Sequence, residues 1–271
     1  MMLADALRSN SLTQCWIPTA EEEALRDLVR AREAAVRDHT RARHRLTKFL
    51  LRQGRRCPQS ARKWTTGWWA WLRQLNFEYV GHTETFLDYV HEVEHAAERI
   101  KRLESAIKSA IEQGREEIKE LVAGLSSLRG VGLITAVTFV AEVGTFERFE
   151  HPQDLMGYVG VIPSEHSSGN QIKRGGITKT GNAHIRRVIG EAAWTYRHRP
   201  AVYGALKRRQ QGLSEEVKAI AWRAQHRLYR RYRVLSERGK PHQVVVTAVG
   251  RELLAFAWEI GHQVYKEQRA A

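Results

Sequence analysis

The run TETFLDYVHEVEHAAERIKRLESAIKSAIEQGREEIKELV, residues 83–122, carries the clearest periodic pattern in the sequence. Its apolar residues recur mostly in alternating steps of four and three: Phe86, Val90, Val93, Ala97, Ile100, Ile107, Ile111, Ile118 and Leu121. Glu104 and Gly114 interrupt this seam without shifting its phase. A heptad pattern sustained over several repeats predicts one long helix that packs in a coiled coil.

Residues 19–51 predict the partner of that helix. Thr19 supplies a cap, and acidic residues fill the first turn. Behind an intermittent apolar face lie Arg26, Arg30, Arg32, Arg37, Arg41, Arg43, Arg45 and Lys48. Because few acidic residues follow Asp38 here, we interpret this surface as phosphate-facing, with Arg41 and Arg45 as candidate nucleic-acid contacts. A solvated helix face stays open as the alternative.

We expect these two helices to run antiparallel, with the tryptophan-rich segment KWTTGWWAWLRQL (residues 63–75) at the turn between them. Tryptophans in such a place can stack on nucleic-acid bases or form a packed hydrophobic elbow. The elbow is favoured, because large aromatic side chains bury most of their surface in a core.

The C-terminal half predicts a compact helical domain. LSSLRGVGLITAVTFVAEVG, residues 125–144, reads as two short helices joined at a Gly-Val-Gly turn. Such a helix-hairpin-helix-like element presents backbone N–H groups to a phosphate, although an ordinary turn between helices remains possible. Further helices are expected from about residue 182, where Gly181-Asn182 supplies a turn and a cap, over 214–236 and over 242–265. The last of them is apolar enough to be a core helix. The predicted fold class is therefore all-α.

The net charge of +14 and the pI of about 10.1 predict a polyanionic partner, and nucleic acid is the usual one. No apolar run approaches the roughly 18 residues of a membrane-spanning helix, and the first residues lack the apolar core of a signal peptide. Cys15 and Cys57 lie far apart, which predicts free thiols in a reducing cytoplasm. We expect a cytoplasmic, nucleoid-associated protein without a membrane partner.

Two short motifs suggest chemistry. HEVEH, residues 91–95, matches a zinc-binding pattern, but Val93 lies on the seam and no third ligand follows, so no metal site is predicted. The polar run GVIPSEHSSGNQIKRGGITKTGNAHIRR, residues 160–187, places His166 two residues before Ser168. Residues this close rarely align as a catalytic pair, which disfavours a self-contained Ser–His hydrolase. Serines that only bond the backbone of a turn are the plain alternative.

Several segments in order resemble one protein family. They are LRGVGLITAVTFVAEVGTFERF, DLMGYVGVIPSEHSSG, GGITKTGNAHIRRVIGEAAW and VVVTAVGRELLAFAW, and LADALRSNSLTQCWIPTAEEEALRDLVRAR is similar to the family's middle section. Together they resemble the bridge-RNA-guided insertion-sequence transposases, which pair an N-terminal RuvC-like DEDD domain with a C-terminal serine-bearing domain. The resemblance divides the chain into the end of a RuvC-like domain (1–18), an antiparallel coiled coil (19–124) and a serine-bearing transposase domain (125–271).

The resemblance also implies a mechanism. The serine before Gly169 in the loop is Ser168, which would be the nucleophile on a DNA phosphate, with Ser164 and Ser167 as weaker candidates. The basic residues that would hold the strand and spread charge in phosphoryl transfer are Lys173, Arg174, Lys179, Arg186 and Arg187. The family's carboxylates would bind Mg²⁺ in the DEDD domain. DNA, a guide RNA and a second copy of the chain, bound through the coiled coil, are the implied partners.

This sequence departs from the family pattern at its start. Asp5 lies in LADALR, which aligns with the helix after the family's metal-binding aspartates. We therefore expect the chain to lack the Mg²⁺ site, which a separate domain would supply, and to be inactive alone. Two functions remain open: a transposase that lacks its metal-binding half, or a non-enzymatic, dimerising nucleic-acid-binding protein derived from one.

Overall fold

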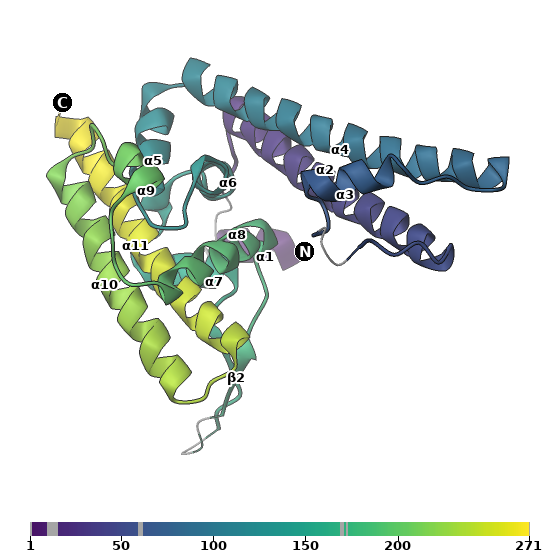
Figure 1. The fold of residues 1–271 in the computed structure, drawn as a ribbon. Helices are drawn as coiled ribbons and strands as arrows, with labels where there is room; N and C mark the ends of the chain where they lie inside the picture. The colour runs from purple at the N-terminus through teal and green to yellow at the C-terminus, as the bar shows by residue number, and fades with distance from the viewer. Residues whose placement is uncertain (1, 10–15, 59–61, 169–170, 172, 271) are drawn as a thin grey trace. The chain divides into compact units, whose positions relative to one another are not determined.

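A computed structural model describes residues 2–9, 16–58, 62–168, 171 and 173–270, and Cys15 lies outside them (Figure 1). The described chain is built of helices with one pair of short strands, which confirms the predicted all-α class. It forms two compact units, a small unit of residues 28–107 and a main unit of residues 1–27 and 108–271. The domain boundaries after residues 18 and 124 stay a prediction.

The small unit is a pair of antiparallel helices, α2 (Ala20–Arg52) and α4 (Val80–Gln113), with α3 (Thr66–Leu72) beside their connection. Residue numbers rise along α2 and fall along α4 in the ion pairs Arg32–Glu104, Asp38–Arg99 and Arg45–Glu92. The antiparallel direction is therefore as predicted, while supercoiling stays a prediction.

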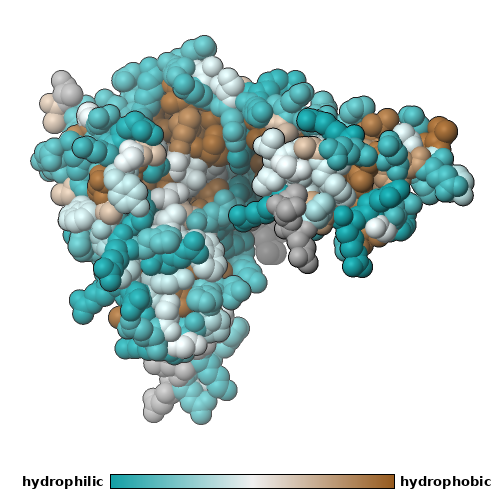
Figure 2. All heavy atoms as spheres, in the orientation of Figure 1, coloured by the Kyte–Doolittle hydropathy of each residue, from teal (hydrophilic) through white to brown (hydrophobic). Residues whose placement is uncertain are grey.

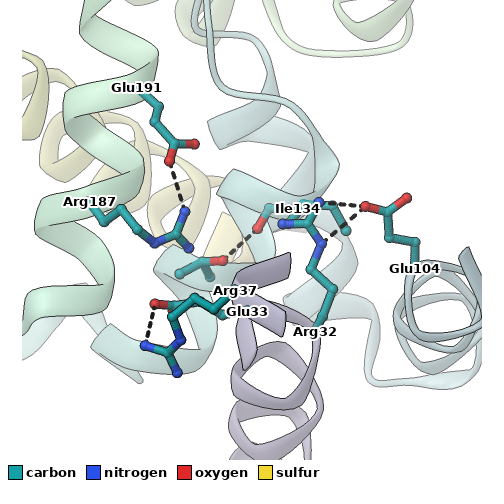
Figure 3. A network of polar contacts seen from close by, with 8 residues as sticks. Arg32, Glu33, Arg37, Glu104, Ile134, Arg187 and Glu191 are labelled. Carbon is teal, nitrogen blue, oxygen red and sulfur yellow. Dashed lines mark hydrogen bonds and ion pairs between the residues drawn. The ribbon is translucent and has the colours of Figure 1, made fainter. Parts of the chain in front are cut away.

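Glu104, which interrupts the apolar seam of α4, has a partner on α2. It accepts hydrogen bonds from Nε and a terminal nitrogen of Arg32 over 3.0 and 2.5 Å, and Figure 3 shows the two side chains facing each other. Both bonds end on Oε1 of Glu104, and hydrogen bonds between two charged groups are stronger than those between neutral ones. The charged position in the seam is thus satisfied inside the small unit.

The core of the small unit lies near the connection between its helices. Buried Phe49, Trp68, Phe86 and Val93 belong to one apolar cluster drawn from α2, α3 and α4. The predicted hydrophobic elbow is confirmed at Trp68, which is 1% exposed. Seam residues of α4 are therefore covered within the chain itself.

The long helix expected over residues 83–122 is in fact two helices. Helix α4 ends at Gln113, and α5 (Glu116–Ser126) begins after Arg115, whose ψ of 144° is extended. Ile118 and Leu121 are buried on α5, which packs against α6 (Leu133–Val143) and α11 (His242–Ala270) of the main unit. The prediction of one continuous helix is therefore wrong. Periodicity alone did not reveal the break, because Ile118 and Leu121 keep the heptad phase of α4.

Helix α11 is the centre of the main unit and confirms the predicted core helix. It packs against α5, α7 (Pro152–Val159), α8 (Ala183–Ala193) and α10 (Glu215–Glu237), and lies beside α10 in Figure 1. The remaining short elements are α1 (Met2–Arg8), η1 (Phe146–Arg148), η2 (Trp194–Arg197) and α9 (Gly204–Arg209).

Hydrophilic residues cover most of the surface visible in Figure 2, in keeping with the high content of charged side chains. None of the helices among the described residues is long and apolar enough to cross a bilayer.

Candidate functional site

The serine-rich loop contains a β-hairpin that the sequence did not predict. Strand β1 (Pro163–Glu165) pairs antiparallel with β2 (Arg174–Ile177), and Figure 1 shows the hairpin extending away from the helices of the main unit. Ser168 and Gln171 form a further bridge at its tip, each donating its N–H to the carbonyl of the other over 3.1 Å. The two strands are three and four residues long, and neither has the alternating apolar pattern by which a strand is predicted.

Two of the three candidate serines hold the hairpin together. The Ser164 hydroxyl donates to the Gly176 carbonyl over 3.1 Å, across the strand pair. The Ser167 hydroxyl donates to Oε1 of Glu165 over 2.8 Å and accepts the Lys173 N–H over 3.3 Å. These two serines therefore bond within the hairpin, as in the alternative to a catalytic role.

Ser168 differs from its neighbours. It takes part in the tip bridge through its backbone and is exposed, and its hydroxyl forms no hydrogen bond with the part of the chain described. The His166 backbone N–H donates to the Lys173 carbonyl, and among described residues no bond joins the His166 ring to Ser168.

The base of the hairpin is fastened to the main unit through Asn182. Its backbone N–H donates to the Tyr158 carbonyl over 2.9 Å, and its Oδ1 caps α8 by accepting the Ile185 N–H over 3.0 Å, as the sequence predicted. Its Nδ2 donates to Oε2 of Glu142 on α6 over 2.7 Å. Glu142 is 1% exposed, and its backbone carbonyl accepts the Tyr158 hydroxyl over 2.8 Å.

Two glycines allow the chain to enter and leave the hairpin at close quarters. Gly160 has φ of 73° and Gly181 has φ of 121°, conformations that side-chain-bearing residues rarely adopt. A Cβ on Gly160 would lie 2.2 Å from the Thr180 carbonyl oxygen, and one on Gly181 would lie 2.2 Å from that of Tyr158. The position of the hairpin therefore depends on both glycines.

The predicted basic residues of the loop fall into different roles. Arg186 donates to the Val159 carbonyl over 2.6 Å, so its guanidinium serves the C-terminal end of α7. Arg187 pairs with Glu191 along α8 over 2.9 Å (Figure 3). Lys173 is exposed on the hairpin.

Lys179 is also exposed, at the base of the hairpin, and its φ of 57° lies in the left-handed region. The backbone of Arg174 lies in β2, but its side chain is outside the described part of the structure.

Both basic candidates on α2 are paired with acids, one from their own helix and one from α4. Arg41 lies 3.5 Å from Asp38, and Arg45 pairs with Glu92 of α4. Glu92 is the glutamate of the H-E-x-x-H pattern, and it pairs with this arginine of α2. The sequence argument missed this because it counted acids only along one helix.

The Gly-Val-Gly turn joins α5 and α6, which pack together as the helix-hairpin-helix-like prediction requires. Gly130 has φ of 81°, and Arg209 donates to the Val131 carbonyl, which fixes the turn from α9. Gly132 precedes α6 without a side-chain cap. Phosphate binding at this helix start stays a prediction.

No group of three or more His, Cys, Asp and Glu among the described residues is arranged to hold a metal ion. The Mg²⁺ that the resemblance implies therefore has no fitting ligand set in this part of the chain. We derive no catalytic step through it.

The known proteins that this chain is similar to are named as transposases. Residues 122–205, which hold the turn, the hairpin and the start of α9, match the model of the Transposase IS116/IS110/IS902 family. The chain is 42% identical over 261 residues to y4qE of Sinorhizobium fredii, named as a transposase, covering 96% of this chain and 63% of that protein. It is 29% identical over 248 residues to the transposase for insertion sequence element IS1533 of Leptospira borgpetersenii, covering 87% of this chain and 70% of the relative.

The chain thus spans less than two thirds of the first of these relatives and more of the second. The matched segment contains the hairpin with Ser168 and helices α6, α7 and α8. Residues 122–205 are thus similar to the Transposase IS116/IS110/IS902 family, and nearly the whole chain is similar to proteins named as insertion-sequence transposases.

Proposed function

We propose that the chain takes part in cutting and joining DNA strands, with Ser168 as the nucleophile and with DNA and a guide RNA as its partners. One observation carries the assignment to Ser168. The Ser164 and Ser167 hydroxyls are used within the hairpin, whereas the Ser168 hydroxyl lies exposed at its tip with no hydrogen bond to described residues.

In the proposed step, Oγ of Ser168 bonds to a DNA phosphorus and loses its proton. The bond from that phosphorus to one strand oxygen breaks, and the released strand end gains a proton as a hydroxyl. Joining reverses the step, because a hydroxyl of another strand attacks the same phosphorus and the serine leaves. The exposed Lys173 contributes positive charge beside the hairpin tip, which favours a pentavalent phosphorus with its extra negative charge.

The test is formation of a covalent bond between protein and DNA. The full chain is mixed with a DNA bearing the insertion-sequence ends, guide RNA, Mg²⁺ and the DEDD domain of a relative, then separated under denaturing conditions. We expect an adduct that mass spectrometry maps to Ser168 and that is lost in Ser168→Ala. Ser167→Ala is the matched control and should retain the adduct. An adduct of undiminished yield in Ser168→Ala would overturn the assignment.

A second function is favoured by the net charge of +14. The chain would then be a non-enzymatic, self-associating nucleic-acid-binding protein. Because Phe86 and Val93 are covered inside the small unit, self-association would use other faces of its helices. This function predicts salt-sensitive DNA binding, a dimer in sedimentation and no adduct under the conditions above.

A further inference from the structure

A cavity of about 600 Å³ lies in the small unit, between the end of α2, the segment that follows it, and α3. Five Arg and Lys residues line it: Arg43, Lys48, Arg55, Arg56 and Lys63. No carboxylate is among its lining residues in the described part of the chain. Its volume is in the range of small-ligand pockets, and its charge selects for an anion.

Arg43 is the most unusual of these cations. Its guanidinium lies over the Trp64 ring, 4.1 Å from the centroid, and its Nε is buried without a hydrogen-bond partner among the described residues. Burial lowers the pKa of this guanidinium. A buried, unpaired N–H of a charged group is unfavourable, and an anion entering the cavity would relieve it.

The aromatic side of the cavity is held rigidly. Trp64 has φ of 67°, a strained conformation for a residue with a large side chain, and such strain gathers at ligand sites. Its ring packs against buried Trp68, with centroids 4.2 Å apart. Half-buried Trp71 also lines the cavity, 6.3 Å from Trp68. The cavity therefore offers flat aromatic surface next to positive charge.

We propose that this cavity binds an unpaired nucleotide of a single-stranded nucleic acid, with its base against Trp71 and its phosphates against the cations. This inference rests on the proposed function, since it presumes a nucleic-acid partner. Aromatic stacking beside a positively charged groove is the general chemistry of single-strand binding. A base inside a duplex is stacked on both faces and cannot enter such a cavity.

The test compares single strands with a duplex on the full chain. Fluorescein-labelled 15-nucleotide oligo-dT, oligo-U and a 15-base-pair duplex serve as probes in a salt series. The variant Lys48→Ala/Lys63→Ala removes two cations from the cavity. The control variant Lys101→Ala/Arg102→Ala removes two exposed cations of α4 that do not line it.

We expect the cavity variant to lose about tenfold in single-strand affinity, with a salt slope shallower by about 1.4, while the control changes less than about twofold. Trp71→Leu should lose about tenfold through the missing stack, and Trp71→Phe should keep most of the affinity. Thermal unfolding followed by circular dichroism verifies that both fold. The strand that binds with the higher affinity, oligo-dT or oligo-U, shows whether the nucleotide comes from DNA or RNA.

Equal losses in the cavity and control variants would overturn the inference. The inference would also be overturned if polyglutamate competed with the labelled strand as strongly as unlabelled oligo-dT does, and if Trp71→Leu left that competition unchanged. If the chain binds the duplex but the cavity variants bind single strands as tightly as the unchanged chain, this inference fails and the proposed function stands. If neither duplex nor single strands bind at low salt, the proposed function fails as well.

Discussion

The Asn182 side-chain amide donates a hydrogen bond of 2.7 Å to the buried carboxylate of Glu142. This contact joins the start of α8, where the hairpin ends, to α6 in the interior of the main unit. The position of Ser168 therefore depends on a bond that lies many residues away along the chain.

Replacing Asn182 tests that dependence. Asn182→Ala removes both the cap of α8 and a partner of Glu142, and we expect a loss of about 2 kcal/mol in the free energy of unfolding. Asn182→Ser retains a capping oxygen but not the amide donor, so it should lose about half as much. Urea unfolding with an unchanged m-value measures the difference. Equal losses for Ala and Ser would contradict a separate role for the cap, and an unchanged stability in Asn182→Ser would contradict one for the Glu142 contact.

Gly160→Ala should displace the hairpin. Its φ of 73° and the 2.2 Å approach of a Cβ to the Thr180 oxygen force a local rearrangement. We expect a cost of about 2 kcal/mol or more in unfolding free energy, together with a loss of the Ser168 adduct. Gly176→Ala is the matched control in the same hairpin, because a Cβ there meets nothing within 4 Å. A Gly176 variant as impaired as the Gly160 variant would show that the close approach is not the cause.

Local sequence signals predicted much of the helical framework. The Thr19 hydroxyl accepts the Glu22 N–H at the start of α2, and Asn182 caps α8. Such caps act over three residues and can be read directly. Apolar periodicity likewise identified α4, because burial of one face imposes it, and a high apolar content identified α11.

Contacts between distant segments could not be read in this way. The acids that neutralise Arg32 and Arg45 come from α4, so no count along α2 could reveal them. The stacking of Arg43 on Trp64 likewise joins α2 to the residues before α3. The β-hairpin was missed for a different reason, since its strands are three and four residues long and neither has an apolar face.

The Arg32–Glu104 pair should contribute to the stability of the small unit. The two side chains are 21% and 39% exposed, so solvent screens them only in part. A double-mutant cycle with Arg32→Ala and Glu104→Ala should give a coupling of about 1 kcal/mol. The Lys108–Glu112 pair, 67% and 61% exposed, is the comparison and should give about 0.3 kcal/mol. Couplings of the same size would contradict the importance of partial burial.

We expect the positive charge of Lys173 to contribute to DNA binding and that of Arg186 to contribute to stability. Lys173 is exposed, so Lys173→Ala should leave stability within about 0.5 kcal/mol and reduce the salt slope of duplex binding by about 0.9. Arg186 is tied to the Val159 carbonyl, so Arg186→Ala should instead cost about 2 kcal/mol in unfolding free energy with little change in slope. Fluorescence anisotropy across a salt series and urea unfolding give the two quantities. A reduced slope in Arg186→Ala with unchanged stability would make Arg186 a phosphate contact, because a guanidinium committed to a carbonyl cannot release counterions from DNA.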